Sequence, residues 1–447
     1  MTPTVRLGAG AGFAGDRIDP AADLACRGQL DYLIFEVLGE RTIATAQRRR
    51  LTNSGPGYDE LLDRRLAATL PACRANATTI ITNGGAADPV AAGERAAQIA
   101  RQTGGEGTRV AVVTGDDVLS KVRQADPVVW ETGRRLSDHS EELISANAYL
   151  GAAPVMEALA LDAAVVITGR LADPALYLGP IAYSHGWDLD GNLDFLGQGT
   201  VIGHLLECAG QLTGGYFADP GVKQVQGLDL LGFPFADVAQ DGTAVFSKLP
   251  GTGGALTTHT VIEQLLYEVG DLSAYITPDA VANFSTVQVL QRGPDRVYVA
   301  GATAERRPDH LKVTLGFRGG WLGEGQISYA GPRARARAEL AGEIVRARLC
   351  SVHGFLAEDI LVELIGAGAA FRGLAGQSDP LEVRLRVAGR VPDKERADQI
   401  GWEVESLYTN GPAAGGGARR HSEEVLAVRS CLLPRDLVEA TVRIQEA

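Results

Sequence analysis

Carboxylates and arginines recur directly after short apolar runs in the first half of the chain. A carboxylate can take or give a proton, and an arginine can hold an anionic group of a substrate in place. These residue types together predict acid–base chemistry on a small organic molecule. The residues expected to transfer protons are Asp16, Glu36, Asp116 and Asp173, and those expected to hold the substrate are Arg17, Asn83 and Arg170.

The elements that must position these side chains alternate between strand and helix. Runs rich in β-branched residues stand at TVRL, DYLIFE, TTIITN, RVAVVTG and AAVVITG, and Ala-, Leu- and Arg-rich segments separate them. This alternation is typical of βαβ units and predicts an α/β domain with a doubly wound parallel sheet. Because ligands bind at the carboxyl ends of parallel strands, we expect one site to gather several loops. These loops are residues 8–19, 36–42, 82–89, 114–118 and 168–174.

The pattern changes near residue 220, where alternating polar and apolar residues replace the wholly apolar runs. We expect residues 1–220 to form the α/β domain that carries the site. Residues 221–447 are expected to form an α+β domain with a mixed or antiparallel sheet. Helices are expected in it at about residues 332–350 and 394–408.

The second domain contributes a glycine-rich loop, KLPGTGG, which precedes a predicted helix. Free N–H groups at the start of a helix suit phosphate or carboxylate. Lys248, Thr252, Gly253 and Gly254 are therefore expected to bind an anionic part of the substrate, such as the diphosphate of coenzyme A. The alternative is a loop and helix cap without a ligand.

A second glycine-rich loop raises the possibility of a nicotinamide cofactor. Gly10, Gly12 and Gly15 fit G-x-G-x-x-G, and Glu36 lies about twenty residues further on. A dinucleotide loop runs straight into its helix, whereas here the helix is expected to begin only near Pro20. We therefore favour a turn that brings Asp16 and Arg17 into the site, and we expect no cofactor.

A metal site is the alternative interpretation of another stretch, TVIGHLLECAG. His204 and Glu207 are three residues apart on a predicted helix and share a face, and His185 could be a third ligand. The spacing lacks a second histidine or carboxylate on that helix. We expect no metal.

Composition and missing motifs narrow the class of protein. The 447 residues carry a net charge of −13, which disfavours nucleic acid and anionic membranes as partners. No apolar stretch approaches the roughly 18 residues of a membrane span. The five cysteines form no C-x-x-C, which indicates a reducing, cytoplasmic location. The chain has no G-x-S-x-G, G-x-x-x-x-G-K-[ST] or H-E-x-x-H, so a standard serine hydrolase, a P-loop NTPase and a zincin are disfavoured.

Several long stretches resemble one known family. GDR, LDYLIFEVLGERTIA, ITNGGAADP, VVITGRLADPAL, GHLLECAGQLTGGYFADPG and KLPGTGG are similar to motifs of the acyclic terpene utilisation (AtuA) family. The resemblance runs from about residue 4 to about residue 350. Longer members carry a C-terminal ferredoxin-like module, and the resemblance leaves open whether residues 355–447 are its remnant.

The resemblance implies the metabolic context of the protein but no particular reaction. The family lies beside enzymes that degrade geranyl- and citronellyl-type acyl-CoA esters, and it supplies no catalytic residue to carry over. Its matching positions coincide with the strand-end residues, and they add Asn147 to the expected substrate-binding set.

The leading hypothesis is a cytoplasmic enzyme of acyl-CoA or carboxylic-acid metabolism. It would use acid–base chemistry for hydration, dehydration, carbon–carbon lysis or hydrolysis, and would form a homo-oligomer. A nicotinamide-dependent oxidoreductase and a non-catalytic subunit of an acyl-CoA-processing complex are the alternatives.

Overall fold

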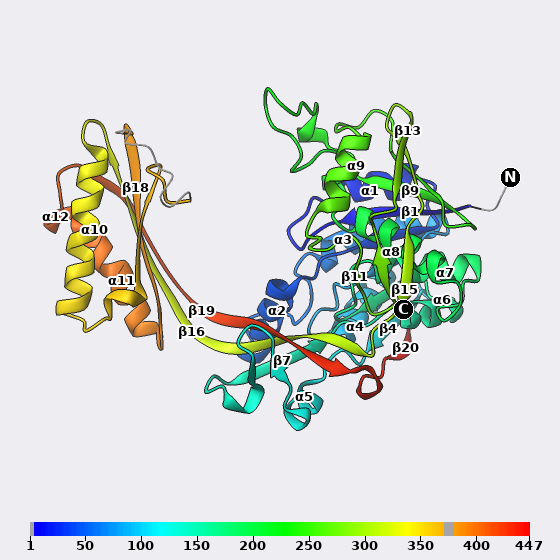
Figure 1. The fold of residues 1–447 in the computed structure, drawn as a ribbon, viewed down its shortest axis with the longest axis horizontal. Coiled ribbons are helices and arrows are strands. Elements are labelled where there is room, and N and C mark those ends of the chain that lie inside the picture. The colour runs from blue at the N-terminus through cyan, green and yellow to red at the C-terminus, as the bar shows by residue number, and fades with distance from the viewer. Residues whose placement is uncertain (1–3, 371–379) are drawn as a thin grey trace. The chain divides into compact units, whose positions relative to one another are not determined.

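The computed structural model describes residues 4–370 and 380–447, and the chain divides into two compact units (Figure 1). The first unit comprises Met1–Gly316 and Val428–Ala447, and the inserted unit comprises Phe317–Ala427. The expected boundary near residue 220 therefore does not separate compact units. Residues after it return to the first sheet, and the chain leaves the first unit only at Gly316.

A ten-stranded sheet forms the centre of the first unit. Its middle strands are parallel and lie in the order β1, β2, β3, β8, β4. They span Thr4–Ala11 (β1), Tyr32–Phe35 (β2), Thr79–Thr82 (β3), Val165–Thr168 (β8) and Arg109–Thr114 (β4). These are the five apolar runs of the sequence, so the parallel sheet expected from them is confirmed.

Antiparallel strands extend this sheet on both sides. β9 (Pro234–Ala239) pairs with β1, and β20 (Thr441–Glu446) pairs with β4. Outward from β9 lie β10 (Ala244–Lys248), β14 (Arg296–Ala300) and β13 (Gln288–Gly293). The mixed sheet expected after residue 220 is thus largely a continuation of the first sheet. A separate small sheet contains β11 (Tyr275–Ile276), β12 (Ala280–Asn283) and β15 (Thr303–Arg306).

Two groups of helices pack against the parallel strands. One group contains α1 (Asp19–Arg27), α3 (Leu62–Ala75) and α4 (Pro89–Gln102), and the other contains α6 (Ala153–Ala160), α7 (Ala175–His185) and α8 (Leu193–Glu207). Further helices are α2 (Glu40–Thr52), α5 (Leu119–Ala125) and α9 (Thr258–Leu266). The first helix starts at Asp19 with Pro20 in its first turn, close to the expected position.

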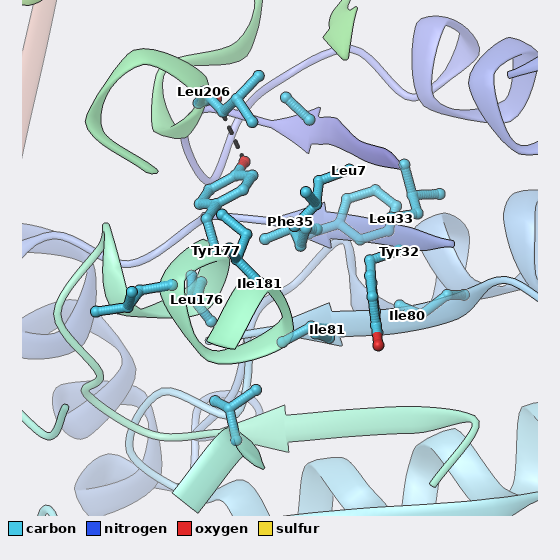
Figure 2. Packing of buried hydrophobic residues seen from close by; sticks show 14 of the residues in the cluster. Leu7, Tyr32, Leu33, Phe35, Ile80, Ile81, Leu176, Tyr177, Ile181 and Leu206 are labelled. Atoms are coloured by element: carbon cyan, nitrogen blue, oxygen red, sulfur yellow. Dashed lines mark hydrogen bonds between the residues drawn. The ribbon is translucent and has the colours of Figure 1, made fainter. Parts of the chain in front are cut away.

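The core of the first unit joins the sheet to α7 and α8 (Figure 2). Leu33 and Ile81 of the strands are fully buried, as is Ile181 of α7. Burying a side chain of this size contributes about 1.5–3 kcal/mol. Tyr177 of α7 is also buried, and its hydroxyl donates a hydrogen bond to the carbonyl of Leu206 at 3.3 Å. This packing fixes the end of α8 relative to α7.

The inserted unit has its own sheet and core. Its strands lie in the order β17 (Ile360–Ile365), β18 (Glu382–Val391), β16 (His310–Ala330) and β19 (Gly415–Pro434), and β18 pairs antiparallel with both β16 and β17. Residues 310–316 of β16 belong to the first unit, and β7 (Leu143–Ala148) pairs with β16 there. Helices α10 (Ala334–Ser351), α11 (Lys394–Glu405) and α12 (Leu407–Asn410) confirm the two helical segments expected from the sequence. Within residues 4–370 and 380–447, no helix is long and apolar enough to cross a bilayer.

Candidate functional site

A pocket of about 650 Å³ lies at the carboxyl ends of β1, β2 and β8. The loops after these strands form its wall, together with the end of α8 and the segment after α9. Its charged lining residues are Asp16, Arg17, Glu36, Glu40, Arg41, Asp173, Glu207 and Glu268. Three of the five loops expected at one site therefore line this pocket.

Asp16 is held by the glycine-rich loop that follows β1. Its carboxylate accepts hydrogen bonds from the backbone N–H groups of Gly12 (2.8 Å) and Arg17 (2.8 Å). Burial raises the pKa of Asp16, although these two N–H groups act in the opposite direction. Arg65, itself paired with Asp59, steadies the loop by donating to the carbonyl of Ala14 at 2.8 Å.

The conformation of this loop does not match that of a dinucleotide loop. The N–H of Gly12 already binds Asp16, and α1 begins only at Asp19. A Cβ at Gly12 would lie 2.5 Å from the carbonyl carbon of Cys208, so this glycine allows close backbone packing. The absence of a nicotinamide cofactor stays a prediction, which this loop favours.

Glu36 follows β2 and is buried at the wall of the pocket. Its Oε1 accepts hydrogen bonds from the N–H of Leu38 (2.8 Å) and from Nδ2 of Asn83 (2.8 Å). Burial and then the charge of Asp173 raise the pKa of Glu36 to about 8, against the lowering effect of Asn83, Leu38 and Arg170. Because Oε1 receives both donors, a proton on this carboxyl group resides on Oε2.

Asn83 was expected to hold the substrate, but the structure gives it another role. It is fully buried, its Oδ1 accepts the N–H of Val37 at 2.8 Å, and its Nδ2 donates to Glu36. It does not line the pocket. Asn83 therefore positions Glu36, and it does so at the carboxyl end of β3.

Arg170 lies behind the pocket wall and orders Asp173. Its Nη1 donates to the carbonyl of Leu38 at 2.5 Å and to Oδ1 of Asp173 at 2.7 Å. The guanidinium stacks 3.9 Å from the ring centre of Tyr149 and is 2% exposed. With this burial Arg170 cannot contact a ligand directly, so it acts on the site through Asp173 and through its charge.

Asp116 and Asn147 were also expected to contact the substrate, and neither lines the pocket. Asp116 is 2% exposed, and its carboxylate accepts from the backbone N–H of Arg170 (2.9 Å) and from Nδ2 of Asn147 (2.9 Å). Its donors therefore come from the neighbouring loop and from β7. Asp116 with Asn147 fixes the backbone that presents Arg170.

The end of α8 contributes a second hydrogen-bonded acid. His204 Nδ1 lies 2.9 Å from Oε1 of Glu207, and His204 Nε2 lies 2.9 Å from the carbonyl oxygen of Gln264. Burial lowers the pKa of His204 to about 4. Burial, followed by the charges of Asp173 and Glu268, raises the pKa of Glu207 far above its usual range.

The positive charges that reach the pocket come from Arg17 and Arg41, which are both exposed. Arg17 donates to the carbonyl of Leu228 at 2.7 Å. Among residues 4–370 and 380–447, neither arginine forms a salt bridge. The carboxylate of Glu40, by contrast, accepts hydrogen bonds from Tyr149 and Lys312. Burial opposes the ionisation of Glu40, but these two partners outweigh burial and lower its pKa to about 2.

The KLPGTGG loop lies outside this pocket. Lys248 binds the carbonyl of Thr252 (2.9 Å) and Asp295 (3.2 Å), and the N–H groups of Gly253 and Gly254 bind the carbonyls of Leu230 and Gln226.

A Cβ at Gly253 would lie 1.8 Å from the carbonyl oxygen of Gly227, which explains the glycine. At the start of α9, the N–H groups of Thr258 and Thr260 donate hydrogen bonds to the side chains of Gln291 and Thr257. The expected anion site at this loop and helix start is disfavoured, because these donors of Lys248, Gly253, Gly254, Thr258 and Thr260 are already bonded within the chain.

No group of three or more His, Cys, Asp or Glu side chains arranged for a metal occurs in the described parts of the chain. His185, the third ligand considered, contacts the carbonyl of Val238 at 3.1 Å and stacks on Trp187. Cys208 lines the pocket, but burial raises the pKa of its thiol far above neutrality, so it is not poised as a nucleophile.

Sequence reasoning missed several pocket residues. Arg41 lies in the first turn of α2, within the loop 36–42 that was expected at the site, but it was not itself chosen as a binding residue. Glu207 was considered only as a metal ligand, and Tyr267 and Glu268 carry no local signal because they reach the pocket through tertiary packing of α9.

The family comparison covers nearly the whole chain. Residues 5–444 match the model of the family described as "Acyclic terpene utilisation family protein AtuA". The chain belongs to the AtuA family. The family match extends past the inserted unit, so residues 355–444 are part of the AtuA region itself. No curated protein and no solved structure matched the chain.

Proposed function

We propose that this AtuA protein is an enzyme that moves protons on an acyl compound, either a carboxylic acid or an acyl-CoA thioester. The observation that carries this proposal is Glu36, a pocket-lining carboxyl group whose pKa is raised to about 8. A group with a pKa near the working pH can both take and return a proton. Perturbed carboxyl groups of this kind gather at functional sites more often than elsewhere.

The surroundings of Glu36 suit a general base. Asn83 and the N–H of Leu38 hold Oε1, which leaves Oε2 to receive a proton from the substrate. Arg17 and Arg41 at the exposed side of the pocket would hold a carboxylate or a coenzyme A phosphate. Hydration, dehydration and carbon–carbon lysis each need such a proton transfer beside an anchored acyl group.

The family name supports one class of carbon skeleton for the substrate, but it does not indicate which reaction takes place. Because the name mentions the utilisation of acyclic terpenes, it supports acyl compounds with acyclic carbon chains as the first to test. The pocket would then bind the acyl end next to Glu36.

The test is a screen of acyl-CoA thioesters and free acids with three proteins: wild type, Glu36→Gln, and Glu343→Gln as a control on the exposed surface of α10. Removal of a general base lowers turnover by about 10²- to 10⁴-fold. We expect that loss for Glu36→Gln with its fold intact, and unchanged turnover for Glu343→Gln. A substrate that is turned over equally by all three proteins would contradict the role of Glu36.

A further inference from the structure

The proposed role of Glu36 gives no part to Glu207, a second acid that lines the pocket. The inference drawn from Glu207 rests on the proposed function. Its carboxyl group lies at the end of a hydrogen-bonded chain that runs from the carbonyl of Gln264 through His204. The imidazole is 1% exposed, and the rings of Tyr275 and Phe284 lie 5.3 and 5.2 Å from its centre. The hydrogen bonds from Gln264 through His204 to Glu207 are therefore enclosed in an apolar part of the structure.

The geometry fixes where the hydrogens lie. A carbonyl oxygen only accepts, so Nε2 of His204 must carry a hydrogen toward Gln264. In a neutral imidazole the other nitrogen, Nδ1, is then an acceptor. The hydrogen between Nδ1 and Oε1 of Glu207 must in that case belong to Glu207, which makes Glu207 a carboxylic acid.

The alternative is a buried ion pair of imidazolium and carboxylate, and the surroundings disfavour it. Two further acids, Asp173 and Glu268, act on Glu207, and Arg170 alone acts in the other direction. Burial of both partners also removes the water that would stabilise two charges. The shifts in pKa of His204 and Glu207 agree in direction with the neutral pair.

The second oxygen of Glu207 has no hydrogen-bond partner. Oε2 is shielded from solvent and contacts no donor in the described residues, although Glu207 lines the pocket and keeps 12% of its side chain exposed. A buried acceptor without a partner costs stability until a donor reaches it. In a neutral acid whose hydrogen is on Oε1, Oε2 is a carbonyl-type acceptor.

We propose that Glu207, as a neutral carboxylic acid, accepts a hydrogen bond at Oε2 from a hydroxyl group of the substrate. The pocket then selects a hydroxylated acyl compound over the same compound without the hydroxyl group. A cationic amine in that place is disfavoured, because its positive charge would favour ionised Glu207 and so disrupt the neutral hydrogen-bonded pair with His204.

Two variants at one position separate these possibilities. Glu207→Gln keeps a donor toward Nδ1 of His204 and a carbonyl oxygen in place of Oε2, so it imitates the neutral acid. Glu207→Met has a similar length but no acceptor. Glu343→Gln on the surface of α10 serves as the remote control.

The probes are butyryl-CoA, 3-hydroxybutyryl-CoA and 3-aminobutyryl-CoA, together with the corresponding free acids, and their affinities are measured by calorimetry. We expect wild type, Glu207→Gln and Glu343→Gln to prefer the hydroxyl compound over butyryl-CoA or butyrate by about tenfold. In Glu207→Met this preference should fall below about threefold. Nitrogen NMR of His204 in wild type should show a neutral ring with hydrogen on Nε2.

Each contrary result overturns the inference in a distinguishable way. Equal binding of the hydroxyl and unsubstituted compounds by wild type overturns the inference but leaves the proposed function standing. Tighter binding of the amine, an imidazolium signal from His204, or loss of the preference in Glu207→Gln shows an ion pair and overturns it as well. Binding of none of the probes overturns the inference, because wild type then shows no preference for a hydroxyl group, and the screen with Glu36→Gln still decides the proposed function.

Discussion

Glu36 illustrates how a single buried carboxyl group couples the site to stability. Its pKa is raised from 4.5 to about 8, so the folded protein binds the proton more tightly than the unfolded chain does. Wild type therefore loses stability as the pH rises between these two values.

Glu36→Gln should be as stable as wild type near pH 5 and more stable by roughly 3 to 5 kcal/mol at pH 9, since each unit of pKa shift corresponds to about 1.4 kcal/mol. Denaturant unfolding of both proteins at these two pH values measures the difference, and other titrating groups cancel in the comparison. A constant difference across the range would contradict the raised pKa.

Asp173 provides a test of the cause of that shift. Its negative charge is the second largest contribution that raises the pKa of Glu36, and it also pairs with Arg170. Asp173→Asn removes the negative charge and leaves the positive charge of Arg170 unbalanced, and both changes favour ionised Glu36. We expect the pKa of Glu36 to fall below about 8, as followed by carbon NMR of labelled glutamate side chains. An unchanged pKa would mean that burial alone sets it.

Individual residue roles were the hardest part to predict from the sequence. Asp16, Arg17, Glu36 and Asp173 line the pocket, whereas Asp116 does not. A polar residue just after a strand looks the same whether it faces a ligand or accepts hydrogen bonds from the next loop. That choice depends on partners such as Asn147 and the backbone of Arg170, which are distant in sequence.

At the scale of the elements, the glycine loop after β1 and the end of α8 must approach each other closely for the pocket to form. A Cβ at Gly12 would lie 2.5 Å from the backbone carbonyl carbon of Cys208, whereas a Cβ at Gly39, which also lines the pocket, would meet nothing within 4 Å.

We expect Gly12→Ala to destabilise the protein by about 1–3 kcal/mol, as overpacking does. Gly39→Ala should cost about 0.5 kcal/mol, because it loses only the preference for glycine over alanine at the N-cap of α2. Thermal unfolding of both variants measures the contrast. Equal stability of the two would contradict the close packing of the β1 loop on α8.

The five parallel strands could be predicted because each is covered on both faces and therefore appears as an unbroken apolar run. Their partners at the sheet edges could not be predicted in the same way. β9 and β20 pair with β1 and β4 across more than two hundred residues of chain, and no local pattern specifies such pairing. The change of pattern near residue 220 therefore marks the change from parallel to antiparallel strands and not a domain boundary.

At the scale of the whole molecule, the described residues of each unit contain a large hydrophobic core of their own, which implies that the two units unfold separately. One core surrounds the parallel strands and includes Leu33, and the other lies between α10, α11 and the sheet of the inserted unit and includes Leu349. Both side chains are fully buried. Among residues 4–370 and 380–447, all the residues that line the pocket belong to the first unit.

We therefore expect scanning calorimetry to show two transitions, each sensitive to one core. Leu→Ala in a core costs about 2–5 kcal/mol, so Leu349→Ala should lower the melting temperature of the inserted unit by roughly 10 °C and leave the other transition unchanged. Leu33→Ala should do the reverse and weaken binding of any ligand in the pocket, because β2 carries Glu36 at its end. A single transition that both variants lower equally would show that the two cores unfold as one cooperative unit.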